Sequence, residues 1–216
     1  VTIHSNGLGD GGIVINPYDN LSYTVKLCTM FRNLEKCAAL AEKSGIQMNL
    51  EGLNITTDHV GNYLKYTSDA AEMIRLIGSP KLKVLYDVYH MQINEGCICD
   101  TIKNFGDTFG HVHIADAPGR HEPGTGEIYF PRVYRALEEI GYQGYVGYEL
   151  FPQTTTAEAV KAIMTLVKKE YAAMSGACQC FSVQNGNFCK RRSALCRLGY
   201  TGQKKLFKSP EGNGNW

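Results

Sequence analysis

The sequence predicts an α/β fold in which strands and helices alternate around a parallel sheet. Up to about residue 173, short apolar runs of strand length alternate with longer segments that have helical periodicity. This alternation is typical of a parallel sheet, open or closed into a barrel, because each return to the sheet needs a crossover, usually a helix. We expect the strands at residues 1–6, 47–51, 83–87, 111–115 and 145–150.

The first two helices are predicted from apolar spacing and from signals at their ends. Residues 25–43 have a continuous apolar face, and this helix is expected to stop at Gly45, a residue common at helix ends. A second helix is expected to begin at Ser68-Asp69, which has the composition of an N-cap, and to end at Gly78.

Two further helices follow in the second half of the chain. Pro131 suits the first turn of a helix that ends at Gly141. Thr156 is expected to cap the last helix, with Glu158 in its first turn, where a carboxylate favours the helix dipole. The four helices and five strands together complete the alternating pattern.

The phase of the strands favours a barrel over an open sheet. Successive strand residues point to opposite faces, so four strands each present a polar residue near the end on one face and apolar neighbours on the other. A barrel converges such residues at its mouth and covers the second face with helices. Gly7, Gly9 and Gly12 match G-x-G-x-x-G after the first expected strand, but no expected helix begins there, which argues against a dinucleotide-binding open sheet. The four polar residues are Glu51, Asp87, His113 and Glu149.

These four residue types suit a divalent cation. Carboxylates with one imidazole favour Mn²⁺ or Mg²⁺ over zinc, which prefers thiolate and imidazole ligands. A cation there could chelate adjacent oxygens of a hydroxy-carbonyl substrate, while one carboxylate takes a proton from the bound carbon and another returns it. His90 and Arg120 could bind substrate oxygens, and Arg120 is suited to a carboxylate.

Each of these residues also has an ordinary structural interpretation. A lone acid at a strand end is more often a cap or a solvated loop residue, whereas four in phase on separate strands favour function. His111 is expected in the barrel interior, and His121 and Glu122 in a solvated loop. His4 and His59 are left without a role.

Composition excludes several classes of function. The 216 residues have a formal net charge of +1, which gives no reason to expect nucleic acid or an acidic membrane as partner. No apolar run reaches the roughly 18 residues that a bilayer span needs. The start of the chain lacks a signal-peptide pattern and is read as a strand entered in mid-fold. The first four of the eight cysteines are expected to be reduced thiols of a cytoplasmic protein.

Four stretches together resemble the hydroxypyruvate isomerase family of xylose-isomerase-like TIM barrels. They are "EGLN…DHVGNYL", "VLYDVYHMQINEG", "GHVHIADAPGRHEPGTGEIYFP" and "GYQGYVGYELFP", and the resemblance covers residues 1–173. It implies that Glu51 and Glu149 are the proton donor and acceptor. It also implies that Glu51, Asp87, His113 and Glu149 ligate a divalent metal where one is used. By resemblance to the related ketose 3-epimerases, His90 and Arg120 contact substrate.

The resemblance implies an intramolecular oxidoreductase that interconverts hydroxypyruvate and tartronate semialdehyde, or a similar small hydroxy-carbonyl acid, through an enediolate. Ketose 3-epimerisation by the same proton chemistry is one alternative. A non-catalytic or inactive fragment is another. Abasic-site endonucleases share this barrel type, but the near-neutral charge argues against DNA as substrate. A homo-oligomeric full-length form is left open.

The extent of the pattern predicts an incomplete (β/α)8 TIM barrel. Successive rim residues are 36, 26 and 36 positions apart, so eight units need roughly 250 residues. The alignment with the family makes residues 1–6 the fourth strand, so strands four to eight are expected in 1–173 and the first three βα units are expected to be missing. Residues 174–216, rich in cysteine and basic residues, are expected to form an irregular tail that is disordered or non-native.

Overall fold

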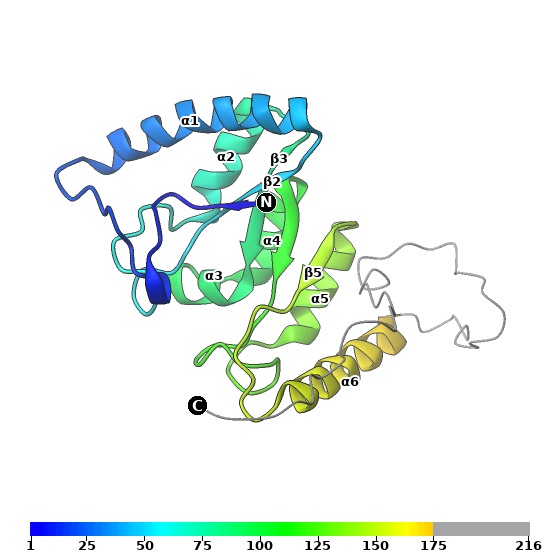
Figure 1. Ribbon diagram of the computed structural model, residues 1–216. Helices are drawn as coiled ribbons and strands as arrows, with labels where there is room; N and C mark the ends of the chain where they lie inside the picture. Colours follow the sequence, from blue (N-terminus) through cyan, green and yellow to red (C-terminus); the bar gives the residue numbers. More distant parts are fainter. Residues whose placement is uncertain (175–216) are drawn as a thin grey trace, which may run out of the picture.

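The computed structural model describes residues 1–174 and contains one sheet of five parallel strands in the order β1-β2-β3-β4-β5 (Figure 1). Each strand pairs with the next one along the chain, as the alternating pattern predicts. The tail expected at 174–216 lies outside the described residues except for its first position. The strands are β1 Thr2–Ile3, β2 Met48–Glu51, β3 Leu82–Asp87, β4 Phe109–His113 and β5 Tyr145–Gly147.

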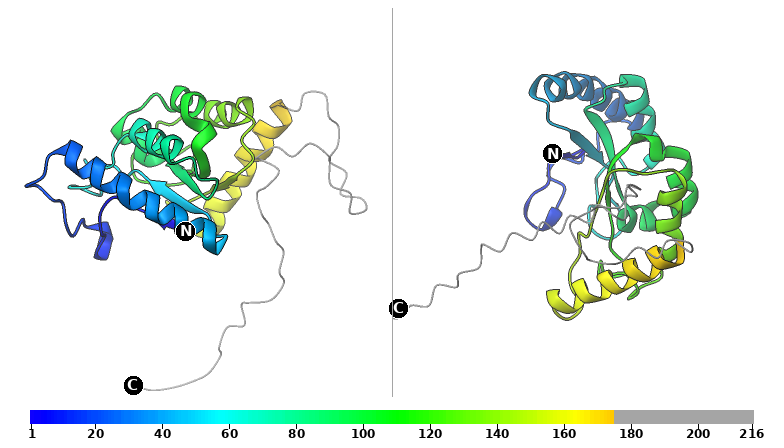
Figure 2. Two further views of the ribbon diagram at one scale, coloured as in Figure 1. Left: turned by 90° about the horizontal axis from the view of Figure 1, so that it is seen from above. Right: turned by 90° about the vertical axis from the view of Figure 1, so that its right-hand side faces the viewer.

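Helices cover one face of this sheet. In Figure 2 (right), α2, α4 and α5 lie along one side, and the loop that contains the first 3-10 helix lies on the other. The α-helices are α1 Tyr23–Ser44, α2 Thr67–Ile77, α3 Val88–Asn94, α4 Ile98–Phe105, α5 Phe130–Glu139 and α6 Thr156–Met174, and the 3-10 helices are η1 Asp10–Gly12 and η2 Gly106–Thr108.

Alternation along the strands separates the core from the polar rim. Leu50, Val84, Tyr86 and Val112 are almost fully buried and belong to the hydrophobic core. Their strand neighbours carry the polar groups on the other face, as the phase analysis predicts. The register pairs Asp87 with His113, so two of the four rim residues lie side by side.

The expected N-cap of the second helix is wrong. Ser68 and Asp69 lie inside the first turn of α2, and the N-cap position is Tyr66, which makes no side-chain cap. The carboxylate of Glu95 instead accepts from the backbone N–H and the hydroxyl of Thr67, at 3.1 and 2.6 Å. A long-range carboxylate therefore satisfies this helix end, which the local sequence cannot reveal.

The last helix begins one residue earlier than a cap at Thr156 predicts. Thr156 is the first helical residue, and the hydroxyl of Thr155 accepts the backbone N–H of Glu158 at 3.2 Å. Pro131 lies in the first turn of α5 as expected. The helices α3 and α4 were not predicted, because both are under nine residues and too short for a clear apolar period.

The short helix α4 contains or borders two cysteines. Cys97 is its N-cap residue and Cys99 lies in its first turn. These two and Cys28 and Cys37 are free thiols. Within the described part of the chain, no helix combines the length and the apolar character that a bilayer crossing requires.

Candidate active site

The four predicted rim residues meet at one place. Glu51, Asp87 and His113 are the last residues of β2, β3 and β4, and Glu149 lies two residues beyond β5. Each offers a ligand atom within 4.8 Å of the others. The carboxyl ends of parallel strands lie at one edge of the sheet, which brings residues nearly one hundred positions apart into a single cluster.

His113 is central to this cluster. Its Nδ1 lies 3.3 Å from Glu149 Oε2 and 3.8 Å from oxygens of both Glu51 and Asp87. The surrounding carboxylates outweigh burial, which acts in the opposite direction, and raise the pKa of His113 to about 10. An imidazole among three acids is therefore protonated in the absence of a cation.

Two atoms of the cluster have no hydrogen-bond partner. Glu51 Oε1 and His113 Nδ1 are both buried and make no hydrogen bond, although they lie 3.8 Å from each other. Buried polar atoms are rarely left this way unless a ligand or an ion satisfies them. Three carboxylates and one imidazole offer the donor set of a divalent cation site, and the two unpaired atoms are among its ligand atoms. The residues present thus fit a divalent cation.

Glu51 has a second imidazole partner that the sequence analysis left without a role. Nε2 of His4 donates to Glu51 Oε2 at 2.9 Å, across 47 positions of sequence. Burial of Glu51, which is 4% exposed, opposes ionisation, but His113 and His4 outweigh it and lower the pKa of Glu51 to about 2. The pairing of Ile3 with Leu50 is the signal that would have placed His4 level with Glu51.

Asp87 links the rim to the start of α3. Its Oδ1 accepts the backbone N–H groups of Tyr89 and His90 at 2.8 and 3.2 Å, so it is the N-cap of this helix. Complete burial and the nearby charge of Glu51 raise the pKa of Asp87 to about 7, although Arg120 and His113 act against this. A cation or a proton therefore stabilises the Asp87 side chain.

Arg120 reaches the cluster from the loop between β4 and α5. Its guanidinium Nη2 lies 3.2 Å from Asp87 Oδ2 and also donates to Glu149. The guanidinium stacks over the ring of Tyr89, with 5.0 Å between Cζ and the ring centroid. Its backbone has φ 55, in the left-handed region, which marks a tightly held position. Arg120 therefore lies at the rim, and its contact with substrate stays a prediction.

His90 also lies beside the cluster. Its Nε2 is 3.8 Å from Asp87 Oδ2, and its ring is 1% exposed. Burial and the charge of Arg120 lower the pKa of His90 to about 3, so the ring is neutral. The other ring nitrogen faces Asn54, which is completely buried.

The structure also places two further histidines and Glu122, the acid of the loop after β4. His111, which was expected in the barrel interior, is half-buried and packs edge-on against His113 with 4.9 Å between ring centroids. His59 packs against His90, with 5.2 Å between centroids. The expectation of a solvated Glu122 is wrong, because it is 6% exposed and accepts the backbone N–H of Gln153 at 3.0 Å.

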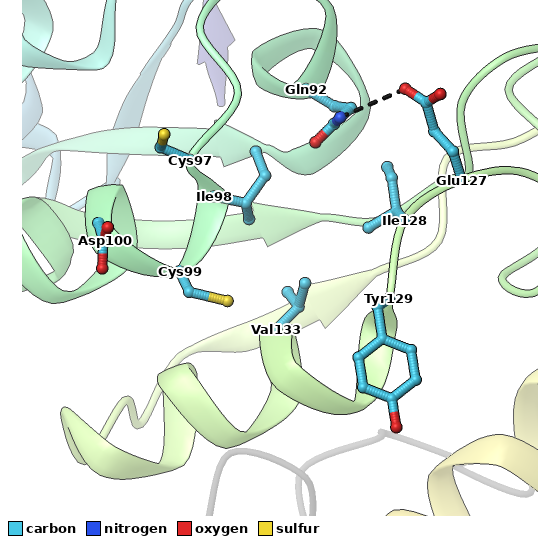
Figure 3. Close-up of a pocket in the computed structure, with 9 residues that line it drawn as sticks. All are labelled: Gln92, Cys97, Ile98, Cys99, Asp100, Glu127, Ile128, Tyr129 and Val133. Atoms are coloured by element: carbon cyan, nitrogen blue, oxygen red, sulfur yellow. Dashed lines mark hydrogen bonds between the residues drawn. The ribbon is translucent and has the colours of Figure 1, made fainter.

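A separate pocket of about 230 Å³ lies on the helix side of the sheet (Figure 3). It is enclosed by the end of α3, the start of α4 and the start of α5, and Gln92 donates to Glu127 across its edge at 3.3 Å. None of the four rim residues lines it. The rim cluster and this pocket are therefore different features of the molecule.

A parallel α/β sheet that gathers acids and an imidazole at the carboxyl ends of its strands has the architecture of a barrel enzyme. Residues 8–168 match the family described as Xylose isomerase-like TIM barrel, and the chain belongs to this family. The predicted fold class is thereby confirmed.

Relatives within the family are isomerases by name. The chain is 39% identical over 133 residues to hydroxypyruvate isomerase of Escherichia coli, covering 62% of this chain and 51% of that protein. It is 34% identical over 129 residues to 2-oxo-tetronate isomerase of Cupriavidus necator, covering 60% and 49%. The chain thus spans about half the length of these curated relatives.

A solved structure shares the fold as well. The 3-keto-D-glucoside 4-epimerase of E. coli superposes with a TM-score of 0.61 at 28% identity, covering 69% of this chain and 56% of that one. Isomerases and epimerases are therefore both among the proteins that this chain resembles.

Proposed function

We propose that this chain carries the proton-transfer site of an isomerase acting on a small hydroxy-carbonyl acid, of the hydroxypyruvate and tartronate semialdehyde type. The observation that carries the proposal is the cluster of Glu51, Asp87, His113 and Glu149 at neighbouring strand ends, with ligand atoms within 4.8 Å. The similarity to hydroxypyruvate isomerase and 2-oxo-tetronate isomerase supports the substrate class.

The two glutamates are the proton carriers in this proposal. They come from the first and last of four adjacent strands, and His113 Nδ1 lies near both, at 3.8 Å from Glu51 and 3.3 Å from Glu149. One carboxylate takes the proton from the hydroxymethyl carbon of the substrate, which gives an enediolate. The other delivers a proton to the former carbonyl carbon, while the proton of the substrate hydroxyl passes to the oxygen of the former ketone.

A divalent cation, Mn²⁺ or Mg²⁺, would be held by Glu51, Asp87, His113 and Glu149. When bound, it would stabilise the negative charge that develops on the two adjacent substrate oxygens. The unpaired Glu51 Oε1 and His113 Nδ1 support this assignment.

Arg120 and His90 are the proposed substrate contacts. Arg120 is 14% exposed at its side chain, and its fork of N–H donors suits a substrate carboxylate. His90 offers a neutral imidazole beside Asp87. A substrate carboxylate bound at Arg120 would favour an acid over a neutral sugar.

The test is turnover and deuterium exchange. We expect Glu51→Gln and Glu149→Gln each to lower the rate of hydroxypyruvate isomerisation by about 10²–10⁴-fold, the usual contribution of an acid–base group. Each should also stop deuterium uptake from solvent into the substrate, followed by NMR. Glu35→Gln, which changes an exposed acid of α1 in the same way, should leave both measurements unchanged. Full turnover in both rim variants would exclude the proposal.

Epimerisation of a ketose is the second candidate, favoured by the likeness to the 3-keto-D-glucoside 4-epimerase. The same cluster could exchange a proton on a sugar carbon. Parallel assays with hydroxypyruvate and with free ketoses separate the two. Faster turnover of a ketose that is insensitive to Arg120→Lys would favour the epimerase.

A further inference from the structure

A buried asparagine behind the rim has its amide orientation determined by the backbone. Asn54 is completely buried in the turn that follows β2. Its Oδ1 accepts the backbone N–H groups of Thr57 and Asp58, at 3.1 and 3.0 Å. Since only an oxygen can accept from these two donors, the Nδ2 group must point the opposite way.

The amide nitrogen of Asn54 lies between two acceptors. It is 2.8 Å from Asp58 Oδ2 and 2.8 Å from His90 Nδ1, and it has one hydrogen for each. The backbone N–H of Asn54 also donates to His90 Nδ1, at 3.4 Å. His90 Nδ1 therefore accepts and carries no proton, and the proton of a neutral ring must be on Nε2.

The protonated nitrogen points to the rim. His90 Nε2 lies 3.8 Å from Asp87 Oδ2, too far for a hydrogen bond, so this N–H is not used by Asp87. We propose that Asn54 is a positioning residue that holds His90 as the Nε2–H tautomer, so that His90 donates a hydrogen bond to a substrate oxygen. Only the identity of that acceptor rests on the proposed function.

The same residues do not make a second cation site in this arrangement. Asp58, His59 and His90 have ligand atoms within 4.8 Å of one another. The N–H groups of Asn54 already occupy the lone pairs of Asp58 and His90 that face each other. A cation there would have to displace the Asn54 amide from both, so a hydrogen-bond network is the better assignment.

The tautomer can be measured directly in the full chain. Long-range ¹H–¹⁵N correlation of labelled histidine rings distinguishes the two tautomers, and His90→Gln identifies the His90 signals. We expect the Nε2–H pattern in the wild type. In Asn54→Asp a carboxylate oxygen replaces the N–H donor, so His90 should shift to the Nδ1–H or the doubly protonated form.

Two further variants serve as controls. Asn33→Asp makes the same chemical change on the exposed side of α1 and should leave His90 unchanged. Asp58→Asn keeps the Asn54 donor and should also preserve the Nε2–H pattern. If Asn54→Asp fails to fold, the wild-type and Asp58→Asn spectra still show whether His90 is the Nε2–H tautomer.

Three results would overturn the proposal. They are an Nδ1–H pattern in the wild type, an unchanged His90 in folded Asn54→Asp, and zinc-induced shifts of His59 and His90 Nδ1 together in a Glu51→Gln background. None of these readings needs turnover, so they remain decisive even if the proposed isomerase activity is absent. Where activity is present, Asn54→Asp should lower kcat about ten- to hundredfold.

Discussion

At the scale of single residues, two buried acids at the same rim differ in how they hold a proton. Glu51 has imidazole neighbours that lower its pKa to about 2, against the effect of burial. Asp87 is buried beside the charge of Glu51, and its pKa is raised to about 7. Burial is common to both, and the neighbouring charges decide the direction.

These shifts predict that the cation-free protein loses stability as pH rises. The raised pKa of Asp87 means that ionisation of its carboxyl lowers stability between about pH 4 and 7. The lowered pKa of His90 acts in the opposite direction up to about pH 6.5, so the net decline is expected mainly above that pH. The raised pKa of His113 corresponds to a stabilisation that is fully present below about pH 6.5 and is lost as pH rises through 10. The lowered pKa of Glu51 corresponds to a stabilisation that is present above its ordinary pKa and is lost only in strong acid.

The measurement is urea unfolding in a chelating buffer from pH 5 to 9. We expect the free energy of unfolding to fall by on the order of 1–3 kcal/mol over this range, allowing for coupling among the groups. Asp87→Asn should reduce the slope below pH 7. A rising stability over the same range would contradict the charge assignment.

At the scale of elements, the loop 116–128 between β4 and α5 holds Arg120 over the rim. The carboxylate of Asp116 is completely buried and accepts backbone N–H groups of Ala117, Gly124 and Ile128, at 3.0, 2.7 and 3.1 Å. One buried carboxylate therefore accepts hydrogen bonds from three positions along the loop and holds them together.

The strand-end loops are also tied to each other. The backbone N–H of Phe151 donates to the Arg120 carbonyl at 2.8 Å, and Nδ1 of His121 donates to the Phe151 carbonyl at 2.7 Å. Arg120 and Glu149 thus belong to two loops that hydrogen bonds join into one unit.

Asp116→Ala should loosen this unit. It leaves three N–H groups without their acceptor, and we expect a loss of about 2–3 kcal/mol in the free energy of unfolding. Activity should fall further than stability, because Arg120 loses its support. Asp107→Ala is the control, since it removes an exposed aspartate that forms an ion pair with surface Arg75 and should cost little. Equal effects of the two variants in urea unfolding would count against a structural role for Asp116.

At the scale of the whole molecule, the rim cluster joins four of the five strands. Its members come from β2, β3, β4 and the segment after β5. A ligand that contacts all four residues can bind the folded sheet but not the unfolded chain. Its binding free energy therefore adds to the stability of the fold.

We therefore expect Mn²⁺ to raise the melting temperature. At one hundred times its Kd, the gain in unfolding free energy is about 2.7 kcal/mol. Affinity should increase with pH, because the cation displaces protons held by Asp87 and His113. Differential scanning calorimetry with Mn²⁺ and with chelator tests this. Asp87→Asn should abolish the gain, and Asp107→Asn should keep it. An unchanged wild-type melting temperature at millimolar Mn²⁺ would exclude a cation site.

Much of the fold and of the rim was open to prediction from the chain alone. The period of two in the strands identifies the faces, and a polar residue at the end of an apolar run identifies the rim, as with Asp87 and His113. Helix ends were predicted less well. The α2 terminus depends on Glu95, which is 28 positions away from Thr67, and no local pattern contains that contact.

The amino-acid sequence by itself determined the alternation of strands and helices, the separation of apolar and polar faces, and the identity of the four rim residues. These are consequences of local periodicity and of parallel strand direction. Only the tertiary structure decided that His4 pairs with Glu51 and that Asn54 orients His90. The physical reason is that hydrogen bonds between side chains 36 to 47 positions apart depend on strand register and on rotamers, which neighbouring residues along the chain do not specify.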